Sequence, residues 1–148
     1  MSNTEATTPQ SFANHSRLVP LYHFVIPAVL LFNVVGAVMM LTGGFSIPGL
    51  AYLLTSLILF PMWLYSRVFP LGVQDRLIRL EQQVRMHRVL PDDLKARIGE
   101  LTKDQYIGLR FASDAELPGL VKEALDGKLD RTAVKQKVQN WQPDHWRI

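Results

Sequence analysis

The stretch between Arg17 and Arg67 most constrains what this chain can fold into. Forty-nine consecutive residues there contain no Asp, Glu, Lys or Arg, and a glycine-containing segment at residues 43–49 (GGFSIPG) divides them into two apolar runs. A helix rises 1.5 Å per residue, so about 20 residues cross a hydrocarbon layer about 30 Å thick. We therefore predict a hairpin of two transmembrane helices, over residues 18–42 and 48–66.

Basic residues near the ends of the two runs predict how the hairpin is oriented. The connection at residues 43–49 carries none, whereas Arg17 precedes the first run and Arg67 and Arg76 follow the second. Because basic flanks stay on the cytoplasmic side, we expect both termini in the cytoplasm and the hairpin in the inner membrane of the cell. Residues 1–17 are mostly polar, which predicts a disordered tail.

Three polar side chains lie inside the predicted spans. Asn33 is near the middle of the first helix, and Thr55 and Ser56 reach a similar depth in the second. We expect a hydrogen bond between the two helices from Asn33 to one of these hydroxyls, worth about 0.6–2 kcal/mol. A polar path for ions is the alternative, but the spans lack the ionisable groups that such paths use.

Residues 67–148 hold fifteen of the sixteen basic and twelve of the thirteen acidic side chains of the chain. This segment has helical periodicity and no strand pattern, so we predict an all-α protein whose cytoplasmic domain, residues 67–148, contains about five short helices. Pro70 and Gly72 predict a break after the second span, with a new helix beginning near Val73. An apolar stripe at helical spacing runs along that helix: Val73, Leu77, Leu80 and Val84.

The same helix is rich in arginine, which leaves three roles open. It could bind the headgroups of the anionic inner leaflet, pair with a like helix as a short coiled coil, or cover the small domain behind it. Two heptads are short for a coiled coil, so contact with the domain core and with lipid headgroups ranks first. The candidate headgroup ligands are Arg76, Arg79, Arg85 and Arg88.

The remaining helices are predicted from capping patterns. Residues 102–105 (TKDQ) and 113–116 (SDAE) each resemble a capping box, and Asp130 is placed as an N-cap. Pro118 favours a helix start near Leu117. The last helix is expected to continue to Trp141 and to end at Gln142 and Pro143.

Aromatic and charged residues gather at residues 110–114 (RFASD) and in the C-terminal tail. Tryptophan pairs of this kind clamp a tail onto its domain, and they also form docking surfaces, because Trp and Arg dominate binding hot spots. Clamping is the favoured interpretation. The candidate residues for contact with a partner are Arg110, Trp141, Trp146 and Arg147.

No motif in the sequence indicates catalysis or a cofactor. Cysteine is absent, the four histidines are scattered, and neither a phosphate-binding loop nor a nucleophile motif occurs. We therefore expect no enzyme, no metal site and no small-molecule substrate. We expect a membrane-anchored interaction protein that binds lipids and docks a partner or itself. The alternatives are a membrane-tethered nucleic-acid-binding domain, for which the charge is modest, and an accessory subunit of a transporter or enzyme complex.

Three segments of the chain resemble a known family. They are residues 73–81 (VQDRLIRLE), residues 110–118 (RFASDAELP) and residues 140–144 (NWQPD). The chain is similar over about residues 20–148 to a family of small bacterial proteins that is catalogued only as a domain of unknown function. The resemblance implies two transmembrane helices followed by a helical cytoplasmic region, and it implies no activity, cofactor or site residue.

Overall fold

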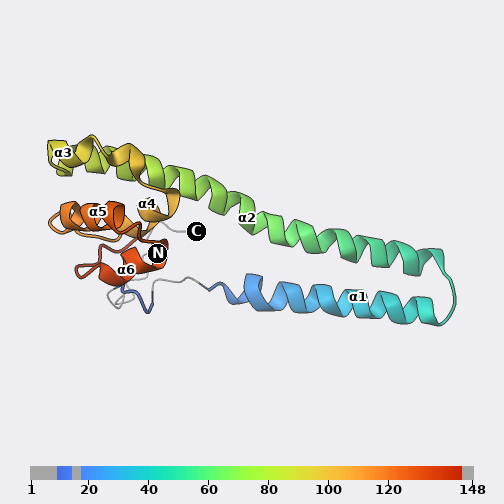
Figure 1. Cartoon of the computed structure of the whole chain (residues 1–148). Coiled ribbons are helices and arrows are strands. Elements are labelled where there is room, and N and C mark those ends of the chain that lie inside the picture. Colours follow the sequence, from blue (N-terminus) through green and yellow to red (C-terminus); the bar gives the residue numbers. More distant parts are fainter. Residues whose placement is uncertain (1–9, 15–17, 145–148) are drawn as a thin grey trace, which may run out of the picture. The chain divides into compact units, whose positions relative to one another are not determined.

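The computed structural model describes residues 10–14 and 18–144, and within these ranges the chain is all-α, without a strand. The chain divides into two compact units. One is Arg17–Leu71, and the other is Gly72–Ile148 together with Met1–Ser16. Figure 1 labels the helices of both units. The all-α fold predicted from the sequence is confirmed.

The first unit is a helical hairpin (Figure 1). A short π-helix, η1 (Leu21–Val25), leads directly into α1 (Ile26–Thr42), and the chain then turns back into α2 (Ile47–Val89). Gly44 makes the turn with φ +132°, a conformation that other residues rarely adopt. The segments Leu21–Thr42 and Ile47–Val89 are each long and apolar enough to cross a membrane.

Two aromatic side chains hold the open end of this hairpin together. The Tyr22 hydroxyl donates to the Trp63 carbonyl oxygen at 2.6 Å, and the Trp63 Nε1 donates to the Tyr22 carbonyl oxygen at 3.0 Å. Their rings lie 5.5 Å apart. These reciprocal bonds join η1, which leads into α1, to α2, since each ring donates to a carbonyl oxygen on the other helix.

The break predicted after the second span does not occur. α2 runs without interruption for 43 residues and contains both Pro61 and Pro70 in its interior, so the prediction of a new helix near Val73 is wrong. Each proline removes one hydrogen bond from the helix. Both prolines are nevertheless accommodated inside the continuous helix.

The second unit packs short helices against the C-terminal part of α2. They are α3 (Asp92–Lys95), the 3₁₀-helix η2 (Ile98–Glu100), α4 (Lys103–Leu109), α5 (Leu117–Asp126) and α6 (Arg131–Lys137). Their core contains Met86 from α2, Tyr106 from α4 and Val121 from α5, all fully buried. Leu94, Ile98 and Leu101 are buried in the same core.

Most helix ends of the second unit lie where capping residues predict them. Thr102 and Gln105 form a complete capping box, with both reciprocal hydrogen bonds present. The Asp130 carboxylate accepts from the Ala133 amide at 2.7 Å, and α5 begins at Leu117. Glu116 accepts from the Ser113 amide at 2.9 Å, which is half of the second predicted box.

The end of the last helix was predicted wrongly. α6 ends at Lys137, and Val138 is extended, with φ −67° and ψ 120°. The residues after Val138 are not helical. The amides of Gln139 and Asn140 donate instead to the Glu116 carboxylate, at 3.1 and 3.3 Å. A tertiary contact thus outweighs the helical pattern that continues to Trp141.

The N-terminal tail is described only at residues 10–14, and the rest of the predicted disordered segment lies outside the described residues. Gln10 is in contact with the C-terminal segment, because its side-chain oxygen accepts from the Asp144 amide at 2.8 Å. Both described ends of the second unit therefore meet each other.

Candidate interaction surface

The C-terminal part of α2 carries apolar side chains on two opposite faces. On one face Ile78, Gln82 and Met86 are buried in the second unit. The other face, which we call the outer stripe, consists of side chains that keep 51–68% of their full exposure: Val73, Leu77, Leu80 and Val84. The expectation that this stripe contacts the domain core is therefore wrong.

The reason lies in the polar residues that share the inner face. Gln82 is 8% exposed, and the adjacent Arg85 side chain is 15% exposed, so polar groups occupy positions that a sequence pattern assigns to solvent. Their hydrogen bonds offset the cost of burial. The apolar periodicity consequently identifies the wrong face of the helix.

Arg85 is a structural residue of the second unit. Its guanidinium donates to the Ala112 carbonyl oxygen at 2.7 Å and to the Asp114 carboxylate at 2.7 Å. A longer bond, 3.4 Å, reaches the Arg110 carbonyl oxygen. These contacts correct the proposed role of Arg85 in binding lipid headgroups, because its donors are directed into the domain.

The other three arginines predicted to bind headgroups are exposed. Arg76 and Arg88 are exposed and have no ion-pair partner among the described residues. The guanidinium of Arg79 lies over the ring of Tyr106, 5.8 Å from its centre. Glu81 is exposed and likewise has no ion-pair partner within the described part of the chain. Charged side chains thus flank the outer stripe on both sides.

The residues proposed for contact with a partner divide into two groups. Arg110 is 7% exposed at its side chain, lies over the Phe111 ring at 4.5 Å and pairs with Asp144 at 3.4 Å. Trp141 packs on Phe111, with ring centres 4.7 Å apart. Arg110 and Trp141 therefore fasten the C-terminal segment onto the domain, and burial corrects the docking role of Arg110. Trp146 and Arg147 lie outside the described residues.

The polar residues of the hairpin are connected differently from the prediction. The Tyr52 hydroxyl donates a hydrogen bond to the side-chain oxygen of Asn33 on the other helix. Thr55 donates to the Ala51 carbonyl oxygen at 2.9 Å, and Ser56 donates to that of Tyr52 at 2.9 Å. The hydroxyl groups of Thr55 and Ser56 satisfy carbonyls one turn earlier in their own helix, so neither is the partner of Asn33.

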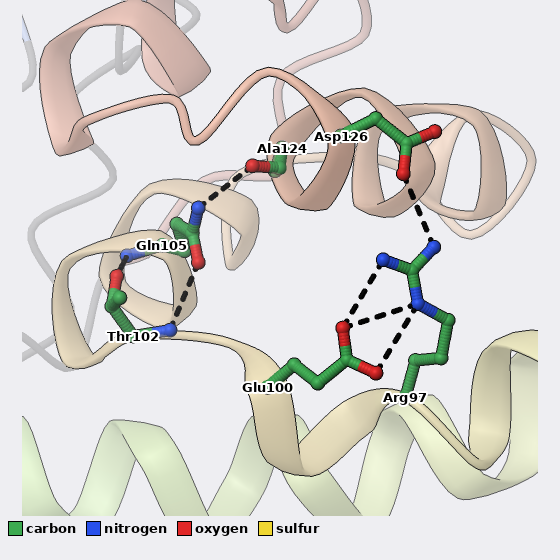
Figure 2. A network of polar contacts seen from close by, with 6 residues as sticks. All are labelled: Arg97, Glu100, Thr102, Gln105, Ala124 and Asp126. Carbon is green, nitrogen blue, oxygen red and sulfur yellow. Dashed lines mark hydrogen bonds and ion pairs between the residues drawn. The ribbon is translucent and has the colours of Figure 1, made fainter.

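Figure 2 shows a polar network that joins the short helices. Gln105 extends the capping box by donating to the Ala124 carbonyl oxygen at 2.8 Å, while Arg97 donates to Glu100 and, at 3.2 Å, to Asp126. The hydrogen bonds that Arg97 donates to the carboxylates of Glu100 and Asp126 raise the pKa of Arg97 above its ordinary value. These polar groups form hydrogen bonds with one another inside the domain, so we assign the network a structural role.

The basic residues of α6 are also occupied within the domain. Arg131 pairs with Asp104 at 2.5 Å, and Lys137 pairs with Glu123 at 2.8 Å. The ammonium group of Lys135 lies 5.3 Å from the centre of the Phe111 ring. All three basic side chains are therefore engaged within the domain. Within the described residues no three His, Cys, Asp or Glu side chains are grouped so that they could hold a metal ion.

Sequence reasoning missed Tyr52, Glu81 and Glu116. Tyr52 could have been recognised from the sequence, since a phenol at the fifth residue of the predicted span 48–66 can reach Asn33 on the first helix. Glu81 is marked only by its position beside the outer stripe, which becomes visible once the inner face of α2 is known. Glu116 gives no signal for its bonds to residues 139 and 140, because they span more than twenty residues.

The fold defines an all-α protein that joins two helices long enough to cross a membrane to a small helical domain. The chain belongs to the family of unknown function DUF6526, whose model matches residues 7–148, and this confirms the resemblance seen in the sequence. Comparison with the curated proteins and with the solved structures found no match.

Proposed function

We propose that this chain is a membrane-anchored interaction protein. The hairpin of α1 and the first part of α2 crosses the inner membrane, the second unit lies in the cytoplasm, and the outer stripe of α2 is the surface that binds another helix. The molecule catalyses no reaction in this proposal and uses no cofactor.

Exposed apolar side chains on the hairpin carry the membrane part of the proposal. Phe32 is 76% exposed, Met39 69% and Ile58 61%, and they belong to a much larger set along both helices. Soluble monomers rarely expose contiguous apolar patches of more than a few hundred Å². Lipid is the solvent that such a surface suits, and the basic residues that follow the second span favour a cytoplasmic domain.

The interaction part rests on the outer stripe. An amphipathic helix normally turns its apolar face inward, whereas here the inner face is already filled by Ile78 and Met86. A second apolar face on the same helix therefore suits a helical partner, which binds through residues spaced by three and four positions. Headgroup binding by Arg76, Arg79 and Arg88 stays a prediction and would bring the domain close to the bilayer.

Site-specific photo-crosslinking in cells tests this function. A photoreactive amino acid at Leu80 of the full chain is expected to give protein adducts of defined mass, because Leu80 lies in the outer stripe. The matched control is Gly72, which is exposed on another face of α2 and has open space around its Cβ position. Only lipid adducts, or no adducts, at Leu80 would exclude a protein-binding surface there.

A further inference from the structure

The outer stripe has the spacing of a coiled-coil seam. Its four members are separated by four, three and four residues, which places Leu77 and Val84 at a positions and Val73 and Leu80 at d positions of a heptad repeat. In a straight helix this spacing keeps all four side chains on one line, and each is more than half exposed. The seam is about two heptads long.

The charged residues beside the seam indicate which partner could bind there. In this register Arg76 occupies a g position and Glu81 the following e position, which are the positions that pair between the helices of a parallel coiled coil. Both side chains are exposed, and neither has an ion-pair partner within the part of the chain that the structure describes. A second copy, parallel and in register, would therefore form the Arg76–Glu81 pair twice, once on each side of the seam.

We propose that the partner of the outer stripe is a second copy of this chain, bound as a parallel two-stranded coiled coil through Val73, Leu77, Leu80 and Val84. The inference rests on the proposed function, since insertion into one membrane gives every copy the same orientation and makes a parallel pairing the natural one.

Two heptads are too short to hold free helices together in water. Two conditions remove that difficulty here. The helix is already formed, because Ile78 and Met86 on its inner face are packed in the second unit. Confinement to a membrane also raises the effective concentration of one copy near another, so that a weak interface is enough.

Disulfide crosslinking tests the pairing in membranes, since the chain has no cysteine of its own. Two differently tagged copies of the full chain are expressed together, and oxidation of the Leu80→Cys variant is expected to give a dimer that carries both tags. Gly72→Cys on another face of α2 and the exposed Lys122→Cys in α5 are the controls, and they should give little product. Equal yields at all three positions would show random collision and overturn the proposal.

Charge reversal tests the register. In the Leu80→Cys chain, Arg76→Glu alone or Glu81→Arg alone turns two attractive pairs into two repulsive ones and should weaken dimerisation roughly tenfold. The double variant Arg76→Glu with Glu81→Arg should restore the original yield. Loss without restoration, or no change in any variant, would exclude this parallel register.

The two crosslinking experiments distinguish failure of the self-pairing from failure of the proposed protein-binding function. If Leu80 gives protein adducts by photo-crosslinking but no disulfide between copies, the surface binds a different protein and the self-pairing falls alone. If Leu80 gives only lipid adducts, both the interaction function and the self-pairing are excluded.

Discussion

At the scale of single residues, Arg85 and Arg88 show how differently two arginines of one helix can be used. Arg85→Gln should lower the free energy of unfolding of the domain by about 1–3 kcal/mol, because its bonds to the Ala112 and Arg110 carbonyl oxygens are lost in a partly buried site. Arg88→Gln is the matched control, and an exposed residue of this kind should change stability by less than about 0.5 kcal/mol. Thermal unfolding of the full chain in mild detergent measures both, and equal effects would contradict the structural role of Arg85.

Asp92 offers a prediction about pH. A hydrogen bond and charge attraction from Lys95, 2.9 Å away, hold the pKa of Asp92 below its ordinary value of 3.8. The folded pKa is thus below the unfolded one, so the pair stabilises the fold above about pH 3.8 and loses that effect as the pH falls through the folded pKa. Carboxyl NMR titration should show the lowered pKa, and Lys95→Met should return it toward the ordinary value. An unchanged titration of Asp92 in Lys95→Met would contradict this cause.

At the scale of elements, the close approach of α4 and α6 depends on Gly108. A Cβ atom there would lie 2.8 Å from Cγ1 of Val134 and 3.3 Å from the Arg131 carbonyl oxygen. Gly108→Ala should therefore destabilise the domain by about 1–3 kcal/mol through overpacking. Gly119→Ala in α5, where the Cβ meets open space, should instead stabilise by about 0.5–1 kcal/mol. Thermal unfolding checks both signs, and stabilisation by Gly108→Ala would show that the two helices separate at little cost.

Local signals predict the helices of the second unit well, and tertiary signals explain the exceptions. The capping box at Thr102 and Gln105 and the N-cap at Asp130 each involve residues three positions apart, so the sequence displays both partners together. The continuity of α2 through Pro70 has no local signal, and the early end of α6 coincides with contacts to a distant segment. Such contacts leave no periodic trace in the sequence.

The candidate site was only partly predictable for the same reason. The members of the outer stripe and their spacing are visible in the sequence, but which face of α2 meets the domain is decided by Gln82 and Arg85, whose polar groups are satisfied on burial. Arg110 likewise reads as a surface residue until its contact with Asp144 is known. Long polar side chains can be buried wherever partners exist, and sequence alone does not name those partners.

At the scale of the whole molecule, buried and exposed apolar side chains are distributed unevenly along the chain, and both parts of the proposed function rest on this distribution. In the second unit the large apolar side chains of the short helices are buried, whereas those of the hairpin and of the outer stripe are exposed. Lipid suits the first exposed surface and a parallel helix suits the second. In the proposed assembly, two copies pair only after insertion, because membrane confinement supplies the local concentration that the short seam requires.

The orientation of the molecule can be tested with the same cysteine-free background. Phe45→Cys places a thiol in the turn between α1 and α2, at a residue that is 79% exposed, and Lys122→Cys places one on the surface of α5. Cells are first treated so that reagents reach the outer face of the inner membrane while that membrane stays closed. An impermeant maleimide should then label Phe45→Cys, whereas Lys122→Cys should react only after the inner membrane is permeabilised. This asymmetry is expected from the proposed topology, since basic residues that follow a membrane span favour the cytoplasmic side. Labelling of Lys122→Cys in intact cells would reverse the topology, and equal labelling of both thiols in a soluble fraction would show that α1 and α2 do not cross a membrane.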